Sequence, residues 1–128
     1  MLQVVRGDFQ KQVAVIALDE PSKGDKTAFL EKILTAVGLD LHKDTLFAAI
    51  QPNRISGLGC FLREKQPRVV LVFGVAPRDL GMQIELFEYQ PIKFHQAIFL
   101  RAHALAILET NREFKGRLWN ALKKVFLS

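Results

Sequence analysis

Two short apolar segments with no alternation of apolar and polar residues set the strongest limit on the fold. Residues 13–18 and 69–74 are apolar throughout. A strand covered on both faces shows this pattern, whereas a strand with one solvent-exposed face alternates apolar and polar residues. Such runs are far shorter than the roughly 20 residues that cross a bilayer, so we expect no membrane span. The sequence therefore predicts a sheet buried on both faces.

Segments long enough for helices lie between the predicted strands. Asp25 is a candidate cap and Gly38 a candidate terminator for the first helix, because aspartate favours N-caps and glycine favours the C′ position. Strands separated by helices favour parallel pairing through right-handed crossovers. We therefore expect one domain over residues 1–128, a three-layer α/β/α sandwich with a central, mostly parallel four-stranded sheet. The predicted strands are 12–18, 46–50, 69–74 and 94–100, and the predicted helices are 25–38 and 109–126.

Composition supports an ordinary folded domain in a reducing compartment. Hydrophobic residues make up 49% of the 128 residues and charged residues 24%, which is close to globular usage. The first residues lack the basic start and apolar stretch of a signal peptide. Cys60 is the single cysteine, so no intramolecular disulfide forms, and we expect a cytoplasmic protein.

The chain carries a mild excess of positive charge. Eighteen Lys and Arg against thirteen Asp and Glu give a net charge of +5, which favours nucleic acid or an acidic protein face as a partner. Arg78, Arg101 and Lys115 are candidate nucleic-acid contacts. The densest basic cluster, around Lys115, also fits a solvated helix face.

Ligands of open α/β sheets bind at the carboxyl ends of the strands. Asp19 and Glu20 follow the first strand there and are candidate general bases, although the same residues also suit a solvated turn. Gly74 ends the strongest strand and permits close backbone approach to a ligand or to the next helix. No glycine-rich phosphate-binding motif occurs, so we expect no nucleotide cofactor.

Metal and nucleophile chemistry have little support in the sequence. His42, His95 and His103 are far apart and show no metal-ligand spacing. Cys60 stands in no nucleophile motif and is interpreted as a structural thiol. We therefore expect neither a metal site nor a cofactor.

Several segments, in order along the chain, resemble the uracil-DNA glycosylase superfamily. The helix 25–38 with the strand 46–50 looks like that family's first helix and second strand, and 68–74 looks like a further strand opening a helix. Residues 103–122 resemble the closing motif, a His-Pro-Ser loop leading into a last helix. In that segment Asn111, Lys115, Trp119 and Leu122 match it in spacing. The resemblance implies a glycosylase-like fold.

The residues that the resemblance would make catalytic are mostly replaced. The family's Gly-Glu-Ala-Pro-Gly loop corresponds to residues 18–22, which read Leu-Asp-Glu-Pro-Ser, and its uracil-reading asparagine has no match in 48–51. His103 stands near the histidine position, but Ala104 and Leu105 replace the proline and serine. Excision requires a pocket for a flipped base and a donor to the departing anion, and His103 is the remaining donor.

The psi subunit family of the bacterial DNA polymerase III holoenzyme is a non-catalytic branch of this fold, and the chain resembles it in length and in the spacing from Asn111 to Trp119. The resemblance implies a non-enzymatic accessory protein whose partners are replication or repair proteins. Two alternatives remain. One is a divergent glycosylase using Asp19 or Glu20 with His103. The other is a non-catalytic DNA-binding module using Arg78, Arg101 and the last helix, with salt-sensitive affinity.

Overall fold

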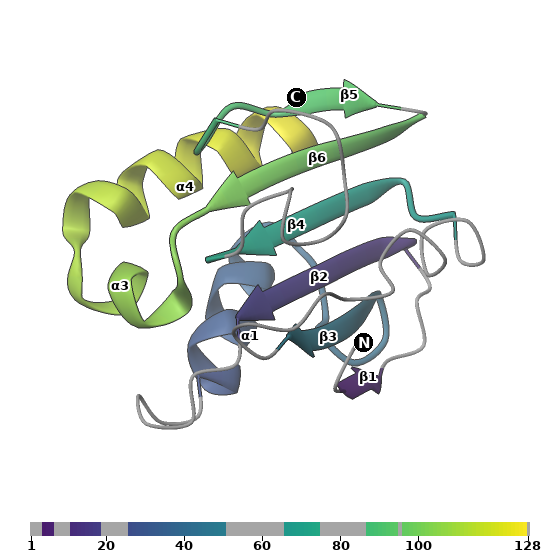
Figure 1. Ribbon diagram of the computed structural model, residues 1–128, viewed down its shortest axis with the longest axis horizontal. Helices are drawn as coiled ribbons and strands as arrows, with labels where there is room; N and C mark the ends of the chain where they lie inside the picture. The colour runs from purple at the N-terminus through teal and green to yellow at the C-terminus, as the bar shows by residue number, and fades with distance from the viewer. Residues whose placement is uncertain are drawn as a thin grey trace.

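The computed structural model describes residues 4–6, 11–18, 26–50, 66–74, 87–94 and 96–127, and it confirms an α/β fold (Figure 1). The described strands are β1 (Val4–Arg6), β2 (Val13–Leu18), β3 (Thr45–Ile50), β4 (Val69–Phe73), β5 (Ile92–Phe94) and β6 (Ala97–Ala102). The described helices are α1 (Thr27–Ala36), α3 (Leu105–Thr110) and α4 (Arg112–Phe126).

All six described strands belong to one mixed sheet in the order β1-β3-β2-β4-β6-β5. The central strands β3, β2, β4 and β6 are parallel, as expected. The edge strands β1 and β5 are antiparallel to their neighbours, so the prediction of a four-stranded sheet is wrong. Each edge strand has three residues, which is too short to show a periodic pattern.

The predicted strand 94–100 crosses a hairpin in the structure. Phe94 of β5 pairs with Ala97 of β6, and Gln96 between them has a φ of 70°. The chain reverses direction there, because a residue in the left-handed region suits a tight hairpin turn. The true strand β6 begins later than predicted and continues to Ala102.

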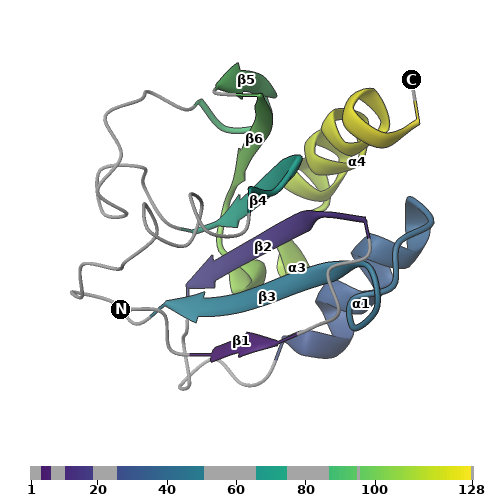
Figure 2. The same cartoon turned by 90° about the vertical axis from the view of Figure 1, so that its right-hand side faces the viewer.

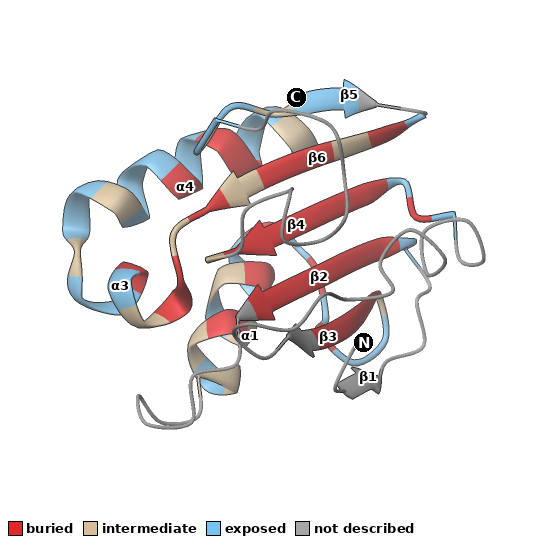
Figure 3. Ribbon diagram, viewed as in Figure 1, coloured by how far each residue is buried: buried red, intermediate tan, exposed pale blue. Residues whose placement is uncertain are grey.

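All three described helices lie on one face of the sheet (Figure 2). Their buried side chains share one core cluster with alternate strand residues such as Val15 and Leu71. Successive side chains of a strand point to opposite faces, so Ile16 and Val72 point away from these helices. Both are at most 1% exposed, and Figure 3 shows β2 and β4 buried along their described lengths. The third layer that we predicted is not among the described residues.

Helix α1 ends as the sequence predicts but begins differently. Gly38 has a φ of 80°, and its N–H donates to the Thr35 carbonyl while the Leu39 N–H donates to the Leu34 carbonyl. These two bonds form a Schellman motif with Gly38 at C′. The first helical residue is Thr27 and Lys26 occupies the N-cap position without a side-chain capping bond, while Asp25, the predicted cap, lies outside the described residues.

The helix predicted over 109–126 corresponds to α4, which begins at Arg112 after Asn111, while residues 109 and 110 belong to α3, a helix that was not predicted. Asn111 has an extended backbone, with φ −121° and ψ 106°, and its Oδ1 accepts a hydrogen bond of 3.0 Å from the Phe114 N–H. An asparagine in this conformation is a strong N-cap and starts α4. The preceding helix α3 has six residues, too few for a helical period to be visible in the sequence.

Candidate functional site

The carboxyl ends of the parallel strands are the place where this topology positions a site. Strand β3 lies on one side of β2 and β4 on the other, so the chain reverses its direction of travel across the sheet between β2 and β4. Open α/β sheets bind ligands at such a switch point. Asp19 and Glu20 directly follow β2, and Arg78 follows β4 by a few positions, but all three lie outside the described residues.

His103 lies at this edge, directly after β6, and its ring is held by two aromatic side chains. The ring stacks on Phe114 of α4 with a centroid distance of 4.0 Å and an interplanar angle of 11°. Its Nδ1 lies 2.6 Å from the Tyr89 hydroxyl. We call Tyr89, His103 and Phe114 the aromatic cluster. It joins the segment before β5 to the end of β6 and the start of α4.

Tyr89 is fixed in the cluster by an unusual backbone. Its φ is 65°, a conformation that non-glycine residues rarely adopt and that surrounding structure must hold. Its N–H donates to the Arg101 carbonyl over 2.8 Å, which continues the hydrogen bonding along β6. The hydroxyl is therefore presented to His103 by β6 itself.

The Tyr89 hydroxyl is a partly buried hydrogen-bond partner of the His103 ring. Burial raises the pKa of Tyr89, and the His103 backbone amide acts in the opposite direction. The phenol thus stays protonated at neutral pH. A phenolic hydroxyl both donates and accepts, so its 2.6 Å contact with Nδ1 is a hydrogen bond in either tautomer of the His103 ring.

The loop that follows His103 is packed into the protein. Ala104 and Leu105 are buried, at 7% and 8% exposed. Gly74, at the end of β4, has a φ of 77°, and a Cβ added to it would lie 2.7 Å from the Ala104 Cβ and 2.8 Å from the Ala104 Cα. The Gly74 N–H donates to the Ala102 carbonyl over 2.9 Å. The close approach that Gly74 permits is therefore to the chain itself.

Arg101 and Lys115 do not form one basic surface. The neighbours of Arg101, Leu100 and Ala102, belong to the core cluster under the helices, so the Arg101 side chain points to the opposite face of the sheet. Lys115 lies on the helical side, with its Nζ 5.8 Å from the ring centroid of Phe29. The structure thus separates these two candidate nucleic-acid contacts.

The described residues contain no group of three or more His, Cys, Asp or Glu side chains that could hold a metal ion. His42 instead lies 3.1 Å from the Glu31 carboxylate, and both side chains are exposed. Cys60 and His95 lie outside the described residues. No helix in the described part of the chain is long and apolar enough to span a membrane.

His103 is the member of the aromatic cluster that was a candidate from the sequence; Tyr89 and Phe114 were not. Phe114 reads as an ordinary apolar position of an amphipathic helix. Tyr89 precedes His103 by 14 residues and belongs to no recognisable motif. Tyr89 is the single tyrosine of the chain, and this is the one feature of the sequence that distinguishes it.

Comparison with known proteins found no match to a protein-family model or to a curated protein sequence. The resemblance to the glycosylase superfamily and to the psi subunit therefore remains a prediction, carried by the residues named above.

Proposed function

We propose that this chain is a non-catalytic accessory protein of bacterial DNA replication or repair, built on a degenerate uracil-DNA glycosylase-like frame and acting through protein–protein contacts. The observation that carries the non-catalytic part is the packed loop after β6. A glycosylase needs a pocket that admits an extruded base. Here Ala104 lies against Gly74 at that edge, and Phe114 covers one face of the His103 ring.

The order of the elements supports the frame. Strand β2, helix α1, strand β3, strand β4 and helix α4 follow one another as the resemblance to the psi subunit family implies. The parallel arrangement of the four central strands is compatible with such a frame. The single cysteine fits the bacterial cytoplasm as the compartment.

Trp119 on α4 is a candidate contact with a protein partner. Its side chain is 37% exposed, and the Lys123 Nζ lies 5.6 Å from its ring centroid. Tryptophan is enriched at the energetic centres of protein interfaces. A partner that covers the ring would bury a large apolar area and keep the cation–π pair.

Affinity capture from a bacterial extract tests this proposal, with the wild type compared with Trp119→Ala. We expect recovery of replication or repair proteins by the wild type and reduced recovery by the variant. Leu127→Ala is the matched control. Leu127 is 56% exposed at the end of α4, and its substitution also removes an exposed apolar side chain. Recovery of no replication or repair protein by the wild type would contradict the proposal.

One observation favours a second candidate, a divergent DNA glycosylase. The Tyr89 hydroxyl and the Phe114 ring hold the His103 ring at the carboxyl edge of the sheet, and a histidine donor positioned there can stabilise a departing anion. Release of a damaged base by the wild type but not by His103→Ala would establish this activity in place of the first.

A further inference from the structure

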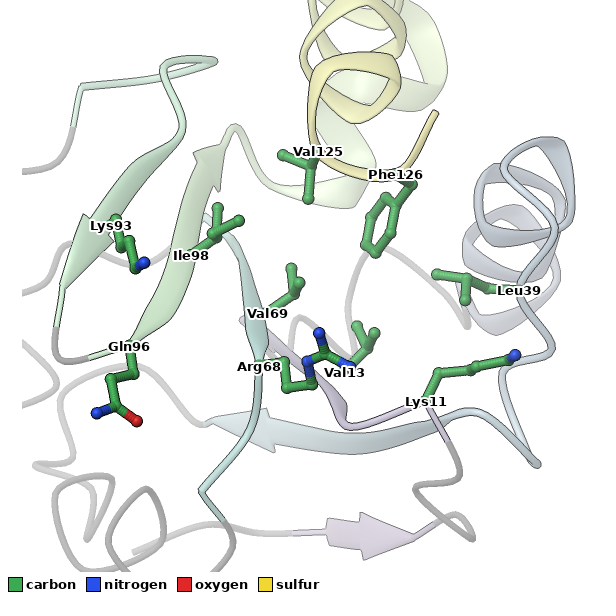
Figure 4. Close-up of a pocket in the computed structure, with 10 residues that line it drawn as sticks. All are labelled: Lys11, Val13, Leu39, Arg68, Val69, Lys93, Gln96, Ile98, Val125 and Phe126. Atoms are coloured by element: carbon green, nitrogen blue, oxygen red, sulfur yellow. The ribbon is translucent and has the colours of Figure 1, made fainter. Parts of the chain in front are cut away.

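A second concave site lies at the opposite edge of the sheet from His103, at the amino ends of the parallel strands. The pocket has a volume of about 420 Å³, within the range of small-molecule sites. Val13, Val69 and Ile98, at the starts of β2, β4 and β6, line it together with Val125 and Phe126 from the end of α4 (Figure 4). Its interior is therefore largely apolar.

The rim of this pocket is positively charged. Lys11, Arg68 and Lys93 line it, and no Asp or Glu does among the residues that the structure describes. Within the described part of the chain, none of these three side chains is within ion-pair distance of a carboxylate. In Figure 4 the Arg68 side chain lies beside Val13, with Lys93 and Lys11 on either side of it. Three cationic side chains that have no carboxylate partner among the described residues favour an anion as occupant.

Arg68 is held in place by the sheet. Its N–H donates to the Gln12 carbonyl over 2.8 Å, and its carbonyl accepts from the Ile98 N–H over 2.9 Å. The side chain thus starts from a backbone fixed between β2 and β6. The exposed guanidinium that extends from this backbone offers paired N–H donors to a planar or tetrahedral anion.

The backbone at this edge has a conformation that recurs before three neighbouring strands. Gln12, Gln66 and Gln96, which precede β2, β4 and β6, have φ values of 57°, 48° and 70°. Left-handed conformations are uncommon for residues other than glycine and cluster at ligand sites. Of these three residues, Gln96 lines the pocket.

We propose that this pocket binds a small amphipathic anion, with a carboxylate or phosphate head on an apolar body. The head contacts Arg68, with Lys93 beside it, and the body lies against Phe126 and the valines of the strand ends. At about 30 Å³ for each water-sized group, the volume suits a ligand of roughly a dozen heavy atoms. Medium-chain carboxylates and alkyl phosphates have this size and chemistry.

Isothermal titration calorimetry of the full chain tests the proposal, with decanoate and decyl phosphate as probes. Decanol is the neutral comparator, and acetate and inorganic phosphate are the anionic comparators that lack a long alkyl chain. We expect saturable one-site binding of at least one probe, weakened by added salt. The preferred head group then follows from the two affinities.

Variants locate the site. Arg68→Gln removes the charge from an exposed side chain and is expected to weaken binding at least about tenfold. Arg112→Gln, at an exposed position at the start of α4, is the matched control and is expected to bind as the wild type does. Lys93→Gln provides the same test in case circular dichroism shows that the first variant is misfolded.

Three results would overturn the proposal: no saturable binding of either probe, equal affinity for decanol, or unchanged affinity in both Arg68→Gln and Lys93→Gln. Because the pocket lies at the edge away from His103, these results are independent of whether the chain is an accessory protein or an enzyme.

Discussion

The glycines of this chain offer a direct test of how closely the loop after β6 is packed. In Gly74→Ala the new Cβ would lie 2.7 Å from the Ala104 Cβ and 2.8 Å from its Cα, which is backbone and cannot rotate away. Its φ of 77° is also unfavourable for alanine. The backbone conformation costs about 1–2 kcal/mol and overpacking about 1–3 kcal/mol, so we expect a loss of roughly 2–5 kcal/mol in the free energy of unfolding.

Gly38→Ala separates the two contributions. Gly38 has a nearly identical φ of 80°, but a Cβ there would meet no heavy atom within 4 Å. We expect this control to lose only the backbone contribution, about 1–2 kcal/mol. Both variants restrict the unfolded chain equally, so the difference between them, about 1–3 kcal/mol, measures the contact with Ala104.

Urea denaturation followed by far-ultraviolet circular dichroism measures both variants against the wild type. We expect Gly74→Ala to melt roughly 4–12 °C below Gly38→Ala in a parallel thermal experiment. Gly116→Ala in α4 serves as a reference that gains about 0.5–1 kcal/mol, since a Cβ there meets nothing and alanine favours helices. Equal losses in Gly74→Ala and Gly38→Ala would refute the packing of the loop against β4.

Three further predictions concern single hydrogen bonds and one pKa. Tyr89 is the only tyrosine, so phenolate absorbance should titrate with a midpoint above 10.0. Because its folded pKa is raised, the stability that it contributes is present below pH 10 and lost as the pH rises through the folded value. Tyr89→Phe should remove this loss of stability at high pH. A phenolate titration midpoint at or below 10.0 in the wild type would argue against burial of the Tyr89 hydroxyl. Asn111→Ala should cost about 1 kcal/mol in urea denaturation by removing the α4 cap, with Asn111→Asp retaining it; equal stability of the two would contradict the capping role. Thr45 is fully buried and its Oγ1 donates to the Leu41 carbonyl, so Thr45→Val should cost about 1–3 kcal/mol, and a neutral effect would disprove that bond's contribution.

The sequence predicted the central strands because burial on both faces leaves a continuous apolar run. Residues 13–18 and 69–74 show this run, and β2 and β4 occupy the middle of the sheet. The edge strands β1 and β5 gave no such signal, because each has only three residues. Each pairs with one neighbouring strand. Gly38 was predictable as a helix end because its role depends on local backbone alone.

The candidate site was predictable in position but not in detail. A carboxyl-terminal strand end is a general site in this class of fold, and the resemblance to the glycosylase closing motif indicated His103. Its contacts depend on Tyr89 and Phe114, which reach it through the pairing of β6 and the packing of α4. Such contacts between distant segments leave no local pattern in a sequence. The same reason hid the basic pocket, whose lining comes from both ends of the chain.

A single-turnover assay with protein in excess over uracil-containing oligonucleotides tests the central claim, a glycosylase-like frame without catalysis, most directly. The oligonucleotides should be single- and double-stranded, and His103→Ala should be measured beside the wild type. We predict no base release above the protein-free rate from either protein. Base release by the wild type that disappears in His103→Ala would contradict the account and identify the aromatic cluster as part of an active site.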